Sequence, residues 1–403
     1  MRRAIEQKRD GEALESSVWE GIVAAYVSGD IDDAQMAALA MACVWRGLTI
    51  TEATALTRSM VASGATLSYP DGMFVVDKHS SGGVSDIVSL VAVPLVAACG
   101  VYVGKLSGRA LGHTGGTIDK LEAIEGFNAT LPMDVFVRQV ERIGCAIAAQ
   151  SDAFVPADKR LYHLRDRTAT VPSIGLIASS IVSKKIAGGA NAFVFDVKCG
   201  SAAFMRDADQ AEALAATLVG ISEQFGRKAR AIVTDMNEPL GRFIGTGLEV
   251  IEAREMLRGV AADERARAGC LRIAEAMLEL GGIKDGSARA KRALVDGSAY
   301  ETFVTMIEGQ GGTRAVLEAL APDPRVELIR ASADGVVNAI DAVALGHVAR
   351  TLTDTNSRAG IRLHARIGDA VASGDVLAEI YGDGVNAESI AGAFTLLSTS
   401  LIR

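Results

Sequence analysis

Two stretches of the chain combine glycine, hydroxyl and lysine residues in the pattern of an anion site. They run from Lys78 to Asp86 (KHSSGGVSD) and from Lys105 to Thr117 (KLSGRALGHTGGT). Glycines let the backbone approach an anion closely, and the N–H groups of a turn and of a helix N-terminus donate to it. One such turn is weak grounds for a site, but two that both carry lysine and hydroxyl groups favour a ligand, most simply phosphate. Further donors and charge are available from Ser80, Ser81, Ser89, Ser107, Thr114, Thr117, Lys78, Lys105 and Arg109.

Hydrophobic patterning predicts the elements that hold these turns. Residues 74–76 form a short apolar run typical of a buried strand, and residues 87–99 have the length of a helix that Gly100 ends. A second strand is predicted over 101–103, and a second helix begins near Thr117. Because phosphate sites in α/β sheets gather at the carboxyl ends of strands, both turns are expected at that edge.

The rest of the chain predicts a small all-helical domain plus a large α/β domain with a mostly parallel sheet and a C-terminal α+β region. Helical patterns fill residues 1–64, where Thr51 and Glu52 are expected to open a helix, and they return at 156–187. We therefore predict three parts, with these boundaries: a helical domain at 1–66 and 156–188, an α/β domain that holds the predicted phosphate site at 72–152 and 190–330, and the C-terminal region at 331–403.

Composition narrows the function classes. The net charge of −8 over 403 residues disfavours nucleic acid or an anionic membrane as the main partner. The N-terminus is charged rather than apolar, and the apolar run at 87–103 is too short to span a bilayer. Five scattered cysteines show neither metal spacing nor a disulfide framework. We expect a cytoplasmic enzyme of small-molecule substrates without a metal.

The sequence also resembles a known family. DKHSSGGVSD and KLSGRALGHTGGTIDKLE are similar to the two signature blocks of the thymidine and pyrimidine-nucleoside phosphorylases. Similar blocks follow at 162–185, 196–205 and 234–241, so that the resemblance extends over nearly the whole chain. It implies phosphorolysis, in which a pyrimidine nucleoside (uridine, thymidine or deoxyuridine) and inorganic phosphate give the free base and a pentose 1-phosphate. It also suggests a homodimer, for which the apolar helices at 35–62 could supply the interface.

The resemblance implies roles for individual residues. Phosphate would be bound by Lys78, Ser80, Ser89, Lys105, Ser107 and Thr117, and the base by Arg165, Ser180 and Lys184. The catalytic set is His79, Lys78, Arg165 and Lys184. The leaving base carries negative charge, which the cationic residues would stabilise, and His79 could protonate it near neutral pH. The alternative interpretations are that Ser107 and Thr117 are ordinary helix caps, that Lys184 and Lys185 belong to a solvated face, and that His79 only packs in a turn.

Two further positions bear on specificity and cofactors. Members of the family that accept uridine place a lysine where Lys105 stands, whereas thymidine-restricted members usually have methionine. Some members hold a monovalent cation such as K⁺ beside the first turn, using backbone carbonyls and a glutamate that Glu252 matches. The alternative is that Glu252 is an exposed helical residue.

Departures from the family pattern keep other functions open. Ser85 stands where glycine is usual and would be strained at a positive φ, Pro172 replaces an aspartate, Ala202 replaces a glycine, and a GAGR segment expected near residue 350 is absent. The alternatives are a thymidine-restricted phosphorylase, an anthranilate-type phosphoribosyltransferase, which would need an acidic magnesium site, and a non-catalytic nucleoside-binding homologue.

Overall fold

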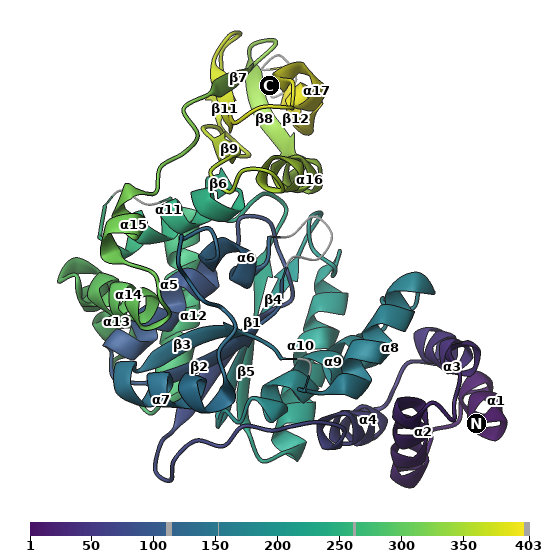
Figure 1. Cartoon of the computed structure of the whole chain (residues 1–403). Coiled ribbons are helices and arrows are strands. Elements are labelled where there is room, and N and C mark those ends of the chain that lie inside the picture. The colour runs from purple at the N-terminus through teal and green to yellow at the C-terminus, as the bar shows by residue number, and fades with distance from the viewer. Residues whose placement is uncertain (110–114, 152, 261–262, 399–403) are drawn as a thin grey trace. The chain divides into compact units, whose positions relative to one another are not determined.

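The computed structural model describes residues 1–109, 115–151, 153–260 and 263–398 (Figure 1). The chain divides into two compact units, each assembled from segments far apart in the sequence. Unit 1 consists of Met1–His79, Gln150–Val197 and Ala208–Val233. Unit 2 consists of Ser80–Ala149, Lys198–Asp207 and Thr234–Arg403. Within the described residues, no helix is both long and apolar enough to cross a membrane.

Unit 1 is mainly helical. Its helices are α1 (Arg2–Asp10), α2 (Ser16–Ser28), α3 (Asp33–Arg46), α4 (Ile50–Ala62), α8 (Pro156–Arg167), α9 (Ile174–Ala187) and α10 (Ala208–Gln224). Helix α4 packs against α2 and α9, and α9 packs against α10. The strands β1 (Val75–Ser80), β4 (Ala192–Cys199) and β5 (Lys228–Asp235) follow one another in the order β1-β4-β5.

Local sequence signals explain where the helices of unit 1 begin. The Asp32 side chain caps α3 by accepting from the Gln35 N–H. Helix α4 begins with a capping box, in which the Thr49 hydroxyl and the Glu52 carboxylate each accept a backbone N–H of the other. The predicted start at Thr51 is thus one residue late, because Glu52 is the third helical residue and pairs back to the cap residue Thr49.

Glu52 also joins α4 to the N-terminal segment. Its carboxylate accepts from the Lys8 ammonium at 2.8 and 2.9 Å and from the Leu14 N–H at 2.9 Å. Both side chains are buried. Burial raises the pKa of Glu52, but the bonds from Lys8, Leu14 and Thr49 outweigh it, and the pKa is lowered overall. A buried ion pair therefore connects α1 to α4.

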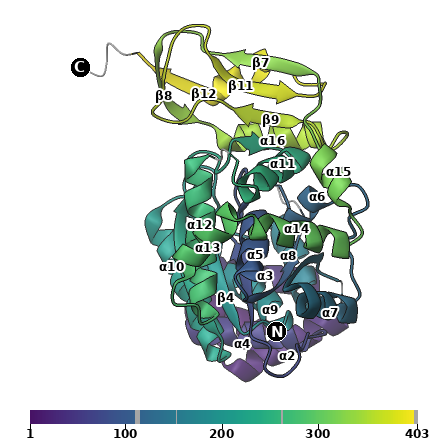
Figure 2. The same ribbon diagram turned by 90° about the vertical axis from the view of Figure 1, so that its left-hand side faces the viewer.

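Unit 2 contains the remaining α/β elements. They are α5 (Val88–Ala98), β2 (Tyr102–Ser107), α6 (Thr117–Leu121), α7 (Met133–Ile143), β3 (Cys145–Ala149), β6 (Phe243–Ile244), α11 (Thr246–Leu257), α12 (Glu264–Leu280), α13 (Gly286–Val295) and α14 (Ser298–Gly309). Strands β2 and β3 are parallel, with Lys105 opposite Ile147 and Ser107 opposite Ala149. Helix α5 is buried from Val88 to Val96 and packs against α11, α12, α13 and α14 (Figure 2). An apolar surface on all sides of a helix is what a central position requires.

The C-terminal part of unit 2 is a small β module. Its elements are α15 (Arg314–Ala319), β7 (Val326–Arg330), β8 (Gly335–Ile340), α16 (Ala342–Thr353), β9 (Gly360–Leu363), β10 (Ala370–Val371), β11 (Val376–Tyr381), α17 (Ala387–Ile390) and β12 (Phe394–Leu397). The sheet orders are β10-β8-β12 and β6-β9-β11-β7. The pairings of β8 with β10 and β12, and of β11 with β7 and β9, are antiparallel.

The predicted fold class is confirmed: a helical N-terminal bundle, an α/β region with parallel strands and a C-terminal strand region. The strands are longer than predicted, because β1 continues to Ser80 and β2 to Ser107. The residues Lys78, His79, Ser80, Lys105 and Ser107 therefore lie on strands rather than in turns.

We predict that Glu52→Ala destabilises unit 1 strongly. The substitution leaves the Lys8 ammonium buried without its carboxylate, which costs about 3–5 kcal/mol. The midpoint of urea unfolding is measured by tryptophan fluorescence. Trp19 on α2 is 1% exposed and reports unfolding, whereas Trp45 is 81% exposed in the folded state and contributes little to the change. The matched control is Glu6→Ala, which breaks the exposed pair with Arg2 and should change stability by less than about 1 kcal/mol. Equal shifts in the two variants would contradict the assigned role of the buried pair.

Candidate active site

The residues predicted to bind the base all belong to unit 1. Asp158, Tyr162 and Arg165 follow one another at helical spacing on α8, which places them on one face of that helix. Ser180 and Lys184 lie one turn apart on α9. The Lys184 ammonium donates to Asp158 Oδ2 at 2.6 Å and to Ser180 Oγ at 2.9 Å. The structure thus brings Ser180 and Lys184 together and adds Asp158, which the sequence did not single out.

Lys184 and Lys185 do not form a solvated face, contrary to the alternative interpretation. The Lys184 side chain is only 23% exposed, and its ammonium lies 6.0 Å from the centre of the Tyr162 ring. The Lys185 ammonium is buried and donates to Asp77 Oδ2 at 2.6 Å. Each lysine is therefore held by a carboxylate.

Arg165 is 1% exposed and is held by the loop between α8 and α9. Its Nε, Nη1 and Nη2 donate to the carbonyls of Thr170, Leu176 and Val171 at 3.2, 3.1 and 2.6 Å. Desolvation lowers the pKa of Arg165. A guanidinium has five N–H bonds, so these contacts leave one donor on each terminal nitrogen.

Lys78 lies on β1 and is fully buried, with its ammonium 3.3 Å from Asp196 Oδ2 on β4. Neighbouring residues of a strand project to opposite faces. His79 is accordingly half-buried while Lys78 is not exposed at all. The expectation that both residues lie in one turn is therefore wrong, because β1 continues through them.

The other predicted phosphate residues belong to unit 2. Lys105 and Ser107 are two positions apart on β2 and share one face of the strand. Lys105 is buried, and so is Ser89 near the start of α5. The Ser80 hydroxyl donates to Asp86 Oδ2 at 2.6 Å and accepts from the Gly82 N–H at 3.3 Å.

Ser107 and Thr117 are not helix caps. Ser107 is the last residue of β2, and Thr117 is the first residue of α6, whose cap position is Gly116. Capping therefore does not account for their hydroxyl groups. Thr114, which was also expected to contribute, lies outside the described residues.

Asp86 organises the first turn and was missed by sequence analysis. Its Oδ1 accepts from the Val88 N–H at 3.1 Å, and its carbonyl accepts from the Lys120 ammonium at 2.9 Å. Lys120 in turn pairs with the buried Glu249 at 2.6 Å. Desolvation raises the pKa of Glu249 despite that partner. The Lys198 ammonium lies 3.9 Å from Asp86 Oδ2. The turn is thus held by side chains from α6 and β4.

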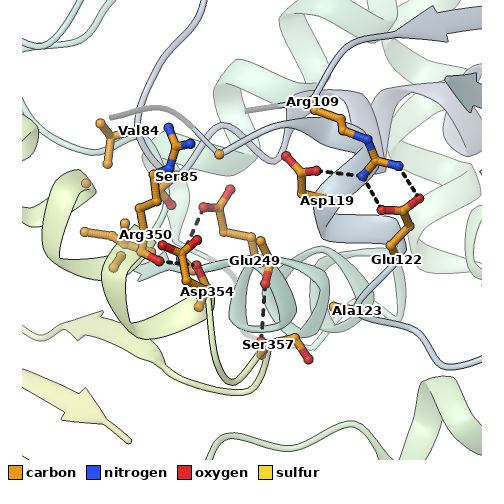
Figure 3. A pocket seen from close by; sticks show the side chains of 17 residues that line it. Val84, Ser85, Arg109, Asp119, Glu122, Ala123, Glu249, Arg350, Asp354 and Ser357 are labelled. Atoms are coloured by element: carbon orange, nitrogen blue, oxygen red, sulfur yellow. Dashed lines mark hydrogen bonds and ion pairs between the residues drawn. The ribbon is translucent and has the colours of Figure 1, made fainter. Parts of the chain in front are cut away.

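A cavity of about 520 Å³ lies in unit 2 beside both predicted turns (Figure 3). Ser85 and Gly115 line it, but none of the residues proposed to bind phosphate does. The other lining residues include the charged side chains of Arg109, Asp119, Glu122, Glu249, Arg350 and Asp354. Carboxylates outnumber guanidinium groups in this set, which does not suit a phosphate ligand.

Arg109 is engaged at the rim of this cavity. Figure 3 shows its guanidinium between Asp119, at 3.1 Å, and Glu122, at 2.8 Å. The bond to Glu122 raises the pKa of Arg109 against the effect of desolvation. The sequence-based suggestion that Arg109 supplies charge to an anion is not supported, because two carboxylates already compensate it. The segment where GAGR is absent contributes Arg350, Asp354 and Ser357 to the same cavity.

Comparison with known proteins gives the class of this chain. A family model described as "Glycosyl transferase family, a/b domain" matches residues 73–300, and the helical bundle domain of the same family matches residues 2–64. The chain belongs to this glycosyl transferase family. A third model, "Pyrimidine nucleoside phosphorylase C-terminal domain", matches residues 336–396.

Individual proteins that are similar to this chain carry more specific names than the family model. The chain is 45% identical over 396 residues to a pyrimidine-nucleoside phosphorylase of Geobacillus stearothermophilus, covering 94% of this chain and 91% of the relative. It is also 45% identical over 386 residues to a thymidine phosphorylase of Mycobacterium tuberculosis, covering 94% of this chain and 89% of the relative. The structure of anthranilate phosphoribosyltransferase from Thermus thermophilus is similar with a TM-score of 0.63, at 20% identity, covering 78% of this chain and 99% of that one. The last likeness concerns the fold alone.

Proposed function

We propose that this enzyme catalyses the phosphorolysis of pyrimidine nucleosides, with inorganic phosphate as the second substrate. Relatives named pyrimidine-nucleoside phosphorylase and thymidine phosphorylase, 45% identical over most of the chain, support the reaction class. The observation that carries the proposal is the fixed cluster of Lys184, Ser180 and Asp158 beside Arg165, because a departing base anion needs such donors.

The chemistry assigns each set of residues a part. An oxygen of phosphate attacks C1′ of the sugar, the bond from C1′ to the base nitrogen breaks, and its electron pair leaves with the base. We assign Lys78, Ser80, Ser89, Lys105, Ser107 and Thr117 to phosphate. Arg165, Ser180 and Lys184 bind the base and stabilise the charge that develops on its carbonyl oxygens. His79 donates the proton that the departing base accepts.

Asp158 is a positioning residue in this proposal. It accepts from the Lys184 ammonium at 2.6 Å and, together with Ser180, fixes the direction in which the third N–H bond of Lys184 points. Tyr162 closes one side of the ammonium. Holding a donor in place before the base arrives avoids the cost of ordering it during the reaction.

Exposed apolar side chains on the N-terminal helices bear on the oligomeric state of the enzyme. Large apolar side chains are exposed on α2, α3 and α4, which lie in and beside the region expected to form a dimer interface: Val27 at 42%, Met41 at 38%, Trp45 at 81% and Ile50 at 40%. Exposed apolar groups of this size favour a protein contact. We infer a cytoplasmic homodimer that binds neither nucleic acid nor membranes.

The names of the relatives favour phosphorolysis over the phosphoribosyltransferase alternative. Incubation with 5-phosphoribosyl pyrophosphate, with and without magnesium, should release no pyrophosphate. Base release from uridine, thymidine, deoxyuridine and cytidine should require phosphate. These assays also separate catalysis from binding alone.

Lys78→Ala should abolish the use of phosphate. Loss of the ammonium removes the charge that we assign to the phosphate dianion, and kcat/KM for phosphate should fall about a thousandfold or more, roughly 4 kcal/mol. Nucleoside binding, measured by calorimetry, should change less than about threefold. A melting curve shows whether loss of the Lys78 ammonium beside Asp196 has unfolded the protein. Near-normal turnover would exclude Lys78 from the site.

Lys184→Ala and Asp158→Ala should mainly impair recognition of the nucleoside. Bonds to charged groups contribute about 1.5–3 kcal/mol, so KM for uridine should rise roughly tenfold to a hundredfold while KM for phosphate stays constant. Asp134→Ala is the matched control, because the ion pair of Asp134 with Arg138, at 2.7 Å, is exposed. If only phosphate affinity changed, the assignment of two separate sets would be wrong.

Lys105→Met should lower activity on uridine more than on thymidine. We propose that Lys105 assists recognition of the ribose 2′-hydroxyl, which thymidine lacks. The kcat/KM for uridine divided by that for thymidine should therefore fall about tenfold, which corresponds to roughly 1.4 kcal/mol. Lys105→Arg keeps the charge and should retain more of the uridine activity. Equal losses on the two nucleosides would remove this specificity role and would leave a phosphate role.

A further inference from the structure

The family resemblance implies a monovalent cation beside the first turn in some members, bound by backbone carbonyls and by the glutamate that Glu252 matches. Glu252 is 6% exposed, so the alternative of an exposed helical glutamate is wrong. The relevant residues all lie in unit 2, and their contacts decide whether such an ion fits this chain.

Ser85 occupies the centre of this region. Its φ is +56°, in the left-handed region where glycine is usual. Its hydroxyl donates to the Phe243 carbonyl at 2.6 Å and accepts from the Gly241 N–H at 3.1 Å. The Leu240 N–H also donates to the Val84 carbonyl at 3.1 Å. The serine side chain thus adds two hydrogen bonds, which glycine could not make, to the backbone bonds that already join the first turn to residues 240–243.

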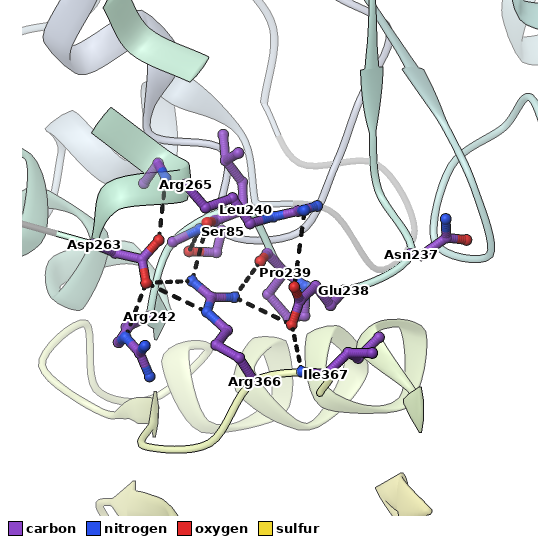
Figure 4. Close-up of polar contacts among 12 residues, drawn as sticks. Ser85, Asn237, Glu238, Pro239, Leu240, Arg242, Asp263, Arg265, Arg366 and Ile367 are labelled. Carbon is purple, nitrogen blue, oxygen red and sulfur yellow. Dashed lines mark hydrogen bonds and ion pairs between the residues drawn. The ribbon is translucent and has the colours of Figure 1, made fainter. Parts of the chain in front are cut away.

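The preceding carbonyls are engaged by a guanidinium group. Arg366 donates from Nη1 to the Pro239 carbonyl at 2.6 Å and from Nη2 to the Leu240 carbonyl at 3.1 Å (Figure 4). Arg366 is only 8% exposed, and Asp263 lies 3.1 Å from it. A cation at these carbonyls would have to compete with a positive group that is already bound there.

Glu252 is directed toward the backbone. Its Oε1 accepts from the Arg242 N–H at 2.8 Å and its Oε2 from the Phe243 N–H at 3.1 Å. Burial raises the pKa of Glu252 to about 7. A Cβ added at Gly241 would lie 2.3 Å from Glu252 Oε2 and 2.6 Å from Ser85 Oγ. Carboxylate, hydroxyl and glycine are therefore closely packed, and both carboxylate oxygens already serve backbone donors.

We propose that in this chain the Ser85 hydroxyl and the Arg366 guanidinium take the structural place of the monovalent cation, so that neither its stability nor its activity depends on K⁺. The hydrogen bonds of Ser85 perform the connection that an ion bridging carbonyls would perform. This explains why the chain has serine at a backbone conformation that favours glycine. The activity part of the inference rests on the proposed phosphorolysis, whereas the stability part does not.

The first test compares the wild-type protein in chloride salts of K⁺, Na⁺ and tetramethylammonium at equal ionic strength. We expect melting temperatures within about 1 °C and uridine phosphorolysis rates within about twofold across the three salts, since no site discriminates the ions. A saturable rise of several degrees with K⁺ would overturn the proposal. Because melting is measured without substrate, this result stands even if the proposed reaction proves wrong.

The second test examines the hydroxyl itself. Ser85→Gly relieves the left-handed backbone but removes two hydrogen bonds of similar total energy, so in tetramethylammonium chloride we expect it to melt near the wild-type temperature or below it. The matched control is Ala169→Gly, because Ala169 has φ +55° and no hydroxyl; that variant gains the relief of strain without losing such bonds and should melt several degrees above the wild type. If Ser85→Gly were as stable as Ala169→Gly, the hydroxyl would not be the connection.

A crystallographic measurement locates any ion directly. Crystals of the wild-type protein soaked in a thallium(I) salt, which substitutes for K⁺, should show no anomalous peak among Ser85, Phe243 and Glu252. A peak bounded by these three residues would overturn the proposal irrespective of activity.

Discussion

Charge compensation of buried lysines is the constraint on which this structure depends. Breaking a buried ion pair by removing one partner costs about 3–5 kcal/mol, so each buried lysine needs its carboxylate. Lys8 meets Glu52, Lys120 meets Glu249 and Lys185 meets Asp77, at 2.8, 2.6 and 2.6 Å. Each pair joins segments far apart in the sequence. The pairs therefore select one arrangement of segments within each unit, because another arrangement would leave a charge alone.

The same requirement shapes the residues that we assign to catalysis. Lys78 is held against Asp196 and Lys184 against Asp158. A lysine fixed in this way does not have to be ordered when the substrate arrives, which is the advantage of a preorganised site. The carboxylate also neutralises part of the charge of the lysine. An anionic ligand would therefore bind to a lysine that already has a negative partner.

Ser85 shows how a departure from a family pattern can be compensated locally. A non-glycine residue at a left-handed φ costs about 1–3 kcal/mol, and Ser85 lies there at +56°. Its hydroxyl makes two hydrogen bonds of about 1 kcal/mol each, to Phe243 and Gly241. The two effects are of similar size, so the backbone strain does not by itself argue against a functional turn.

The sequence by itself determined the helices, the order of the strands along the chain and the residue types of the site. These features depend on short-range signals: apolar periodicity, the glycines after helices and the polar cap residues before them, such as Asp32. Only the tertiary structure decided the ends of β1 and β2 and the partners of the charged groups. Strand length depends on pairing with a neighbour, and nothing near Asp158, Asp196 or Glu249 in the sequence indicates which lysine each will meet. Packing brings those partners together, and packing is set by contacts between distant segments.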